Sequence, residues 1–196
     1  MPEITGLEAQ KKNKERVNVY VDDAFFCGLS LDDVVRLKLV NGLVLAEHEL
    51  GHIASIGEEN KFFTKALEYL LRSPKTEFQV KQYLYKKQIE TVAVNKIIER
   101  LKSLNYLNDE LYVEDFVRAK EGKLGRKVIK QKLAQKGIYN AEIEVGDQTD
   151  ACLAVAEKYI RNKELTSENM AKMCRYLFGK GFDYDIINSV REKICR

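Results

Sequence analysis

The segment that decides the fold is six residues long and occurs three times, as LYKKQI (84–89), LAQKGI (133–138) and LFGKGF (177–182). Shifting the sequence by 49 and then by 44 residues superposes these copies. Self-similarity at such a period is typical of stacked helical units, each too small to bury its apolar face alone. The aligned columns are Val80, Ile129 and Met173; Leu84, Leu133 and Leu177; Lys87, Lys136 and Lys180; Ile89, Ile138 and Phe182; and Val94, Ile143 and Ile187.

The first copy predicts three helices. Apolar residues recur at helical spacing in residues 62–71, and Ser73-Pro74 then supplies an N-cap followed by proline at the first position of a second helix. That helix ends near Gln88, where the other copies have Gly137 and Gly181, the residue type that a left-handed C-cap favours. A third apolar stripe, residues 94–101, stops at Asn105. Each unit is therefore expected to be a three-helix module of about 40 to 50 residues.

The third copy follows the same plan, and the middle copy departs from it. After Ile143 the middle copy reaches Gly146-Asp147, so its third helix is expected to be very short or interrupted before Asp150 caps the next helix. The predicted fold is mainly α, with three tandem three-helix repeats forming a curved helical array. The expected repeat boundaries are 58–108, 109–149 (the basic repeat) and 150–196.

Residues 1–57 differ in kind from the repeats. Val17, Val19 and Val21 alternate with polar residues, Asp22-Asp23 suits a tight turn, and residues 24–29 supply a partner strand. These features predict a small β-hairpin. Ser30 and Asp33 then predict a capping box at the start of a helix that closes at Asn41-Gly42.

The composition indicates a well-cored protein without a membrane span. The chain is 45% hydrophobic, yet it has no apolar run near twenty residues. No apolar segment typical of a signal peptide precedes Val17, which predicts a cytoplasmic protein. The four cysteines stand singly, as Cys27, Cys152, Cys174 and Cys195, and are expected to be free thiols.

One motif points to zinc chemistry. His48-Glu49-Leu50-Gly51-His52 matches H-E-x-x-H, in which two histidines on a helix bind zinc and the glutamate acts as general base. A catalytic zinc needs three protein ligands, and these are the only two histidines in the chain. The longer pattern would also require glycine at Ser55 and histidine at Glu58. We therefore expect two surface or half-buried histidines on a short helix, and no metal or other cofactor.

Positive charge is concentrated in the middle of the chain. Residues 118–137 contain eight basic residues and one acid, whereas the whole chain has a net charge of only +3. Lys123, Arg126, Lys127 and Lys130 follow the spacing i, i+3, i+4, i+7, which predicts one basic helical face. Such a face is typical of a surface that meets phosphates or an acidic protein groove. The alternative is an ordinary solvated face, although such faces normally mix charge signs.

Several fragments together resemble the RecX family of recombination regulators. They are RSPKTEF (72–78), LYKKQI (84–89), LNYLNDE (104–110), Phe116-Val117 and Lys180-Gly181-Phe182. The resemblance covers about residues 60–196, and Val17 to Leu39 also resembles an N-terminal extension that some members carry. Gln88 in place of glycine and the irregular third helix of the middle copy depart from the family pattern.

The resemblance implies a regulator of the RecA recombinase and no catalysis by this chain. It implies binding in the helical groove of the RecA filament on DNA, with suppression of ATP hydrolysis, strand exchange and filament growth, and hence a role in recombination and the SOS response. RecA is the expected partner, single- or double-stranded DNA is a second candidate, and the chain is expected to be a monomer. The expected contact residues are Arg72, Arg118, Lys123, Arg126, Lys127 and Lys130.

Two other classes of function remain open. A stand-alone nucleic-acid-binding repeat protein, such as a transcription regulator, would also use the basic segment. A zinc hydrolase acting through His48, Glu49 and His52 is the more remote alternative. Metal analysis would separate the hydrolase from the two binding proteins. Co-precipitation with RecA, with and without DNA, would separate the binding proteins from each other.

Overall fold

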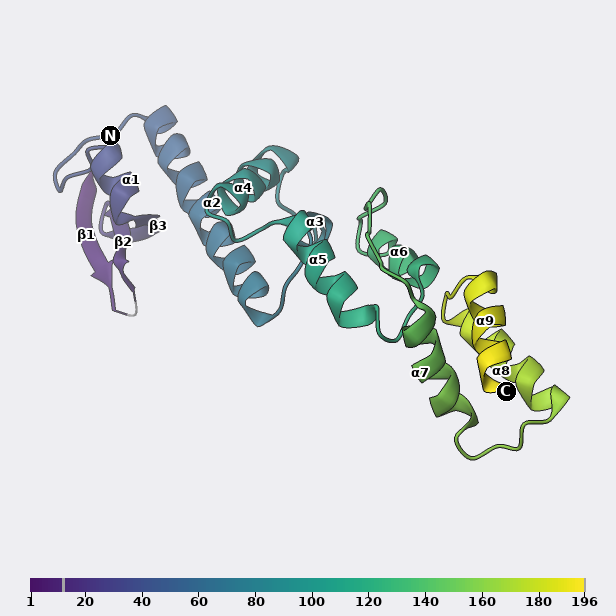
Figure 1. Cartoon of the computed structure of the whole chain (residues 1–196). Coiled ribbons are helices and arrows are strands. Elements are labelled where there is room, and N and C mark those ends of the chain that lie inside the picture. Colours follow the sequence, from purple (N-terminus) through teal and green to yellow (C-terminus); the bar gives the residue numbers. More distant parts are fainter. Residues whose placement is uncertain (12, 196) are drawn as a thin grey trace. The chain divides into compact units, whose positions relative to one another are not determined.

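A computed structural model describes residues 1–11 and 13–195, which form three strands and nine helices. Figure 1 labels the strands and helices of the chain. The chain divides into two compact units. The first comprises residues 1–73 and 80–106, and the second comprises residues 74–79 together with residues from 107 onward. In the described part of the chain, no helix combines the length and the apolar character that a membrane crossing requires.

The first unit begins with an antiparallel sheet in the order β1-β2-β3. Strand β1 is Ile4–Gln10, β2 is Asn13–Val21 and β3 is Ala24–Ser30. Asp22 and Asp23 both have positive φ, at 47° and 64°, which is the backbone that a tight two-residue hairpin turn requires. The hairpin expected from the sequence is therefore confirmed, and the structure adds β1, which lacks regular alternation of apolar and polar residues.

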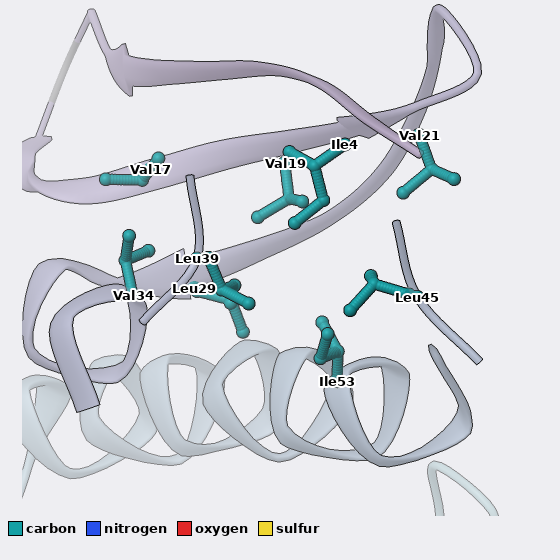
Figure 2. Close-up of a cluster of buried hydrophobic side chains, with 9 residues drawn as sticks. All are labelled: Ile4, Val17, Val19, Val21, Leu29, Val34, Leu39, Leu45 and Ile53. Atoms are coloured by element: carbon teal, nitrogen blue, oxygen red, sulfur yellow. The ribbon is translucent and has the colours of Figure 1, made fainter. Parts of the chain in front are cut away.

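Alternation along β2 builds the core of this sheet. Val17, Val19 and Val21 point to one side, where Ile4 of β1 and Leu29 of β3 join them (Figure 2). Helix α1, Leu31–Arg36, and helix α2, Glu47–Arg72, cover this face, and α2 packs closely along β3. The remaining members of the cluster are Val34, Leu39, Leu45 and Ile53.

The expected cap of α1 is confirmed, but the helix ends early. The Ser30 hydroxyl accepts a hydrogen bond from the Asp33 backbone N–H at 3.1 Å. The helix closes at Leu37, and Lys38 takes the left-handed conformation with φ 53°, so the expected end at Asn41-Gly42 is wrong. A positive φ in one residue reverses the chain as a glycine cap would, and Lys38 does so at a steric cost.

A chain of polar side chains ties α1 to the helices beside it. Asn60 of α2 donates from Nδ2 to Oδ2 of Asp33 at 2.7 Å, and Arg100 donates to Oδ1 of Asn60 at 2.9 Å. Arg100 lies on helix α4, Thr91–Ser103. Asp33 and Asn60 are buried, and a buried polar group is stable only when it is hydrogen-bonded.

The second helix of the first repeat starts later than expected. Helix α3 is Glu77–Tyr85, and Ser73 is the C-cap of α2, so Ser73-Pro74 does not begin α3. Thr76 and Gln79 begin it instead, because each backbone N–H bonds the side chain of the other residue, at 3.2 and 3.3 Å. This is a capping box, displaced from the position that the proline indicated.

The second unit contains the other two repeats. The middle repeat has α5, Asp109–Lys120, and α6, Arg126–Ala134; the last repeat has α7, Thr149–Ile160, α8, Ser167–Gly179, and α9, Tyr184–Ile194 (Figure 1). Asp147, not Asp150, receives the backbone N–H of Thr149 at the start of α7. The described residues 140–148 form no helix, in agreement with the weak helical signal there.

The non-helical segment is nevertheless anchored. Ile143 is buried in the core of the middle repeat, as its column predicts. The Gln148 side chain accepts from the Arg126 N–H at 3.0 Å and donates to the Leu124 carbonyl at 3.2 Å. These bonds satisfy polar groups around the start of α6, so the segment replaces a third helix without leaving Gln148 unpaired.

The repeat columns form the cores. The columns that begin with Val80, Leu84 and Val94 are buried throughout, and Leu84, Leu133 and Leu177 are fully so. In the column of Ile89, Ile138 and Phe182 only Phe182 is buried, and the other two are half-buried. The column of Gln88, Gly137 and Gly181 has φ values of 60°, 87° and 90°, which confirms the left-handed caps and the exception at Gln88. A repeated sequence therefore gives a repeated structure at each of these positions.

The turns that contain Gly137 and Gly181 make matching contacts within the second unit. Lys136 accepts a hydrogen bond at its carbonyl from the Thr76 hydroxyl at 2.6 Å, and Lys180 accepts one from the Gly125 N–H at 2.9 Å. Thr76 and Gly125 each directly precede a second helix, α3 or α6. In both cases, the turn that ends the second helix of one repeat is hydrogen-bonded to the residue just before the second helix of the preceding repeat.

Candidate functional site

The predicted basic residues do not all share one helical face. Arg126, Lys127 and Lys130 lie on α6, but Lys123 lies in the turn before it, because Gly125 is the N-cap. The expectation that Lys123 extends the α6 face is therefore wrong. Arg118 lies near the end of α5, and Arg72 is the exposed last residue of α2 in the first compact unit.

Three of these residues already have partners within the chain. Lys127 pairs with Asp183 at 2.9 Å, and Arg118 pairs with Asp115 at 3.7 Å. Arg126 reaches the Val145 carbonyl at 3.5 Å. An ion pair lowers the charge that a residue presents to a ligand, so Lys127 and Arg118 contribute less field than the sequence implies.

The tertiary structure instead gathers five lysines around a hollow of about 550 Å³ in the second unit. The hollow is also lined by Phe116, Leu124, Gln79 and Gln135, and no carboxylate lines it. Among the described residues, none of the five lysines forms an ion pair within 4.0 Å. We call this set the lysine hollow: Lys120, Lys123, Lys132, Lys136 and Lys180.

Aromatic rings hold two of these lysines. The Lys136 ammonium lies 5.9 Å from the Tyr112 ring centre and 6.0 Å from that of Phe116. The Lys180 ammonium lies 5.1 Å from the Tyr176 ring centre. A ring face attracts a cation, which limits the freedom of a long side chain and keeps its charge at a defined place.

The lysine column has a similar setting in the outer repeats. In the first repeat, Lys87 lies 5.7 Å from the Tyr83 ring centre, and Tyr83 stacks on Tyr69 with centres 4.5 Å apart. In the last repeat, Tyr176 stacks on Tyr159 at 4.7 Å. Lys132 occupies the column of Tyr83 and Tyr176, so the middle repeat has an extra cation where the others have a ring.

Sequence reasoning selected one member of the lysine hollow, Lys123, as a contact residue. Lys120, Lys132 and Lys136 lie in the basic segment but were not selected, and Lys180 lies 44 residues beyond Lys136. The lysine column itself could have found Lys136 and Lys180, but it does not include Lys120 or Lys132. This column repeats a lysine just after the second helix of each repeat, and equivalent positions in a repeat array have equivalent environments.

The H-E-x-x-H segment does not assemble a metal site in the described residues. It lies on α2, which has 26 residues, so the expected short helix is wrong. The Glu49 carboxylate accepts a hydrogen bond from the Ala46 N–H at 2.8 Å and so caps the helix. No group of three or more potential ligands converges within the described part of the chain.

Burial makes two of the thiols poor nucleophiles. All four cysteines are free, and burial raises the pKa values of Cys27 and Cys152 to about 11. The thiolate is the nucleophilic form, so these two groups are unreactive near neutral pH.

Comparison with known proteins connects this architecture to one family. A profile of the regulatory protein RecX N-terminal domain matches residues 2–46, and profiles of the first, second and third RecX three-helix domains match residues 63–101, 108–144 and 146–190. The chain belongs to the RecX family. The RecX family resemblance seen in the sequence is thus confirmed, together with a mainly helical fold of three helical domains. The middle domain has two helices followed by the non-helical residues 140–148.

Individual relatives extend over almost the whole chain. The regulatory protein RecX of Clostridium perfringens (strain 13 / Type A) is 31% identical over 205 residues, covering 99% of this chain and 97% of that protein. The regulatory protein RecX of Bacillus licheniformis is 31% identical, covering 98% of this chain and 78% of that protein. A crystal structure of regulatory protein RecX shares the fold, with a TM-score of 0.79, 23% identity and coverage of 98% of this chain and 100% of that one.

Proposed function

We propose that this chain binds the RecA filament on DNA and inhibits its ATPase, strand exchange and filament growth. It would thereby modulate homologous recombination and the SOS response to DNA damage, acting in the cytoplasm as a monomer. The observation that carries the proposal is the match to RecX regulatory proteins along nearly the whole chain. The names of the relatives describe them as regulatory proteins. That RecA is the regulated partner is part of our proposal.

The chemistry of the second unit supports a binding role. Its cations lie on helix ends and turns that apolar columns and backbone hydrogen bonds hold in place. Such a surface attracts phosphates or acidic side chains, and the association weakens as salt screens the charges. A regulator that lies across a filament needs affinity and bulk, and it needs no reacting group of its own.

We propose four successive domains along the chain. Residues 58–108, 109–149 and 150–196 act as successive repeats, and residues 1–57 form the N-terminal module. The proposed contacts are made by exposed cations of the repeats. The proposed contact residues are Arg72, Arg118, Lys123, Arg126, Lys127 and Lys130.

A second candidate is direct binding of nucleic acid without RecA. The lysine hollow favours it, because several unpaired cations in one place are the usual footprint of phosphate recognition. The two functions are compatible, since a protein that lies on a filament can contact both protein and strand.

RecA-dependent ATP hydrolysis on single-stranded DNA tests the proposal. Adding the purified chain at stoichiometric amounts should slow hydrolysis, and the chain should sediment with RecA filaments formed on DNA. A chain that leaves hydrolysis and strand exchange unchanged, and that stays in the supernatant, contradicts the proposed function.

A further inference from the structure

The lysine hollow combines charge with a half-buried aromatic ring that stacks on Tyr112. Five lysines and no carboxylate line it, and Phe116 forms part of the same lining. Lys123 and Lys132 are exposed, while Lys120, Lys136 and Lys180 are half-buried. Partial burial weakens screening by salt, so the field inside the hollow is stronger than the same five charges would produce on a flat surface.

Two of the lysines that line the hollow project from tightly packed turns. Gly137 packs so closely on the start of α3 that a Cβ there would lie 2.2 Å from the Phe78 Cβ. Gly181 packs equally closely on α6, where a Cβ would lie 2.6 Å from the Val128 nitrogen. The lysines just before these glycines, Lys136 and Lys180, therefore project from fixed turns, which reduces the entropy lost when a ligand binds.

We propose that the lysine hollow is a binding site for a short stretch of single-stranded nucleic acid. The lysine ammonium groups contact successive phosphates, and the Phe116 ring offers a surface on which one base stacks. Lysines bind phosphates as point charges, and base stacking on aromatic rings is the usual companion of such charges in single-strand sites. This assignment rests on the proposed function, because it names the strand in the filament as a direct contact of the chain.

The shape favours a single strand over a duplex. The lining residues come from α3, α5, α6 and the turns after α5, α6 and α8, so several elements contribute charge to one hollow. A duplex is too wide and stiff to enter a hollow of about 550 Å³ and would keep its bases away from Phe116. A flexible strand can place a phosphate and an unstacked base there together.

Fluorescence anisotropy with a labelled fifteen-residue oligothymidylate, in the absence of RecA, tests the assignment. The variant Lys120→Gln/Lys123→Gln/Lys132→Gln should bind at least tenfold more weakly at low salt. Its slope of log affinity against log salt should fall by about two, because each lost phosphate contact removes about 0.7. The matched control replaces three exposed lysines of the last repeat, Lys158, Lys172 and Lys193, with glutamine and should lose less than threefold.

The aromatic part has its own test. Phe116→Leu should weaken binding of the oligothymidylate about tenfold while leaving the salt slope unchanged, since stacking involves no counterion release. On an abasic strand of equal length, Phe116→Leu and the unchanged protein should bind equally. An equal loss on both strands would mean that Phe116 only supports the fold, and it would overturn the stacking assignment.

Competition separates the possible ligands. An unlabelled single strand should displace the probe, whereas the same length of duplex, polyglutamate of equal charge and ATP should compete at least tenfold less well. Displacement by polyglutamate at the strand's own concentration would assign the hollow to an acidic peptide, and displacement by ATP would assign it to a free nucleotide. Either result overturns the proposal, as does equal binding by the triple variant and its control. RecA is absent throughout, so these outcomes leave the ATPase test of the proposed function independent.

Discussion

At the scale of single residues, Gly137 and Gln88 occupy equivalent left-handed positions but differ in the space available for a side chain. Gly137 has φ 87° and lies against Phe78, so it needs both the backbone freedom and the small volume of glycine. Gln88 has φ 60° but is exposed. Only the backbone conformation opposes a side chain there, which explains how the first repeat accommodates glutamine.

This difference predicts opposite effects of two substitutions. Gly137→Ala should lower the free energy of unfolding by about 2 to 5 kcal/mol, because it adds left-handed strain and a methyl group without space. Gln88→Gly should raise it by up to about 1 kcal/mol, because relief of strain exceeds the added flexibility of the unfolded chain. Urea denaturation followed by circular dichroism measures both, and a tolerated Gly137→Ala would show that the turn moves freely away from Phe78.

Glu49 tests the zinc hypothesis at the same scale. Its carboxylate caps α2 by accepting the Ala46 N–H, and glutamine can accept the same bond. Glu49→Gln should therefore leave both helicity and RecA inhibition unchanged, and purified protein should contain well under one zinc per chain. Stoichiometric zinc, together with a loss of function in the variant, would instead support the hydrolase.

At the scale of elements, the polar chain from Asp33 through Asn60 to Arg100 couples α1, α2 and α4. Burial acts to raise the pKa of Asp33, but hydrogen bonds from Ser30, Asn60 and Arg36 outweigh it and lower the pKa below 3.8. The charged carboxylate is thus favoured in the folded state. Its contribution to stability is present above pH 3.8 and is lost as pH falls through the lower, folded pKa.

Asp33→Asn should consequently flatten the acid limb of the stability profile. The unchanged protein should lose stability between pH 3.8 and the folded pKa of Asp33, and the variant should lose less over that window. At neutral pH the variant should be less stable, because a buried amide cannot accept all the bonds that the carboxylate accepts. Denaturation midpoints measured from pH 2 to 7 check this, and Asp32→Asn on the exposed side of α1 is the control. Parallel acid limbs for both variants and the unchanged protein would contradict it.

At the scale of the whole molecule, we expect the proposed function to depend on charges that the fold does not need. Lys123, Arg126 and Lys130 are exposed, and they form no ion pair within the described residues. Reversing all three to glutamate should change the free energy of unfolding by no more than about 0.5 kcal/mol per residue. Inhibition of RecA ATPase should fall at least about tenfold, and inhibition by the unchanged protein should fade as salt rises.

The control for this triple glutamate variant replaces two acidic residues of the last repeat with lysine. Glu157→Lys/Glu164→Lys changes two exposed residues outside the basic segment and should alter inhibition much less. Lys127 is left out of the triple variant because a glutamate there would face Asp183, and the repulsion would destabilise the fold. If the triple variant inhibits as well as the unchanged protein at low salt, the predicted contact residues are only a solvated face.

The amino-acid sequence alone determined the repeats, their apolar columns and the left-handed caps, because spacing and backbone preference act over a few neighbouring residues. In this way, the sequence predicted that Leu133 is buried and that Gly137 has a left-handed backbone conformation. The β1 strand could not, because its pairing partner rather than its own pattern stabilises it. The charge pattern was decided by tertiary structure: Asp183 neutralises Lys127 from 56 residues away, and Lys180 joins lysines from another repeat. Net local charge depends on which distant residues the fold brings within a few ångströms, and no local pattern contains that information.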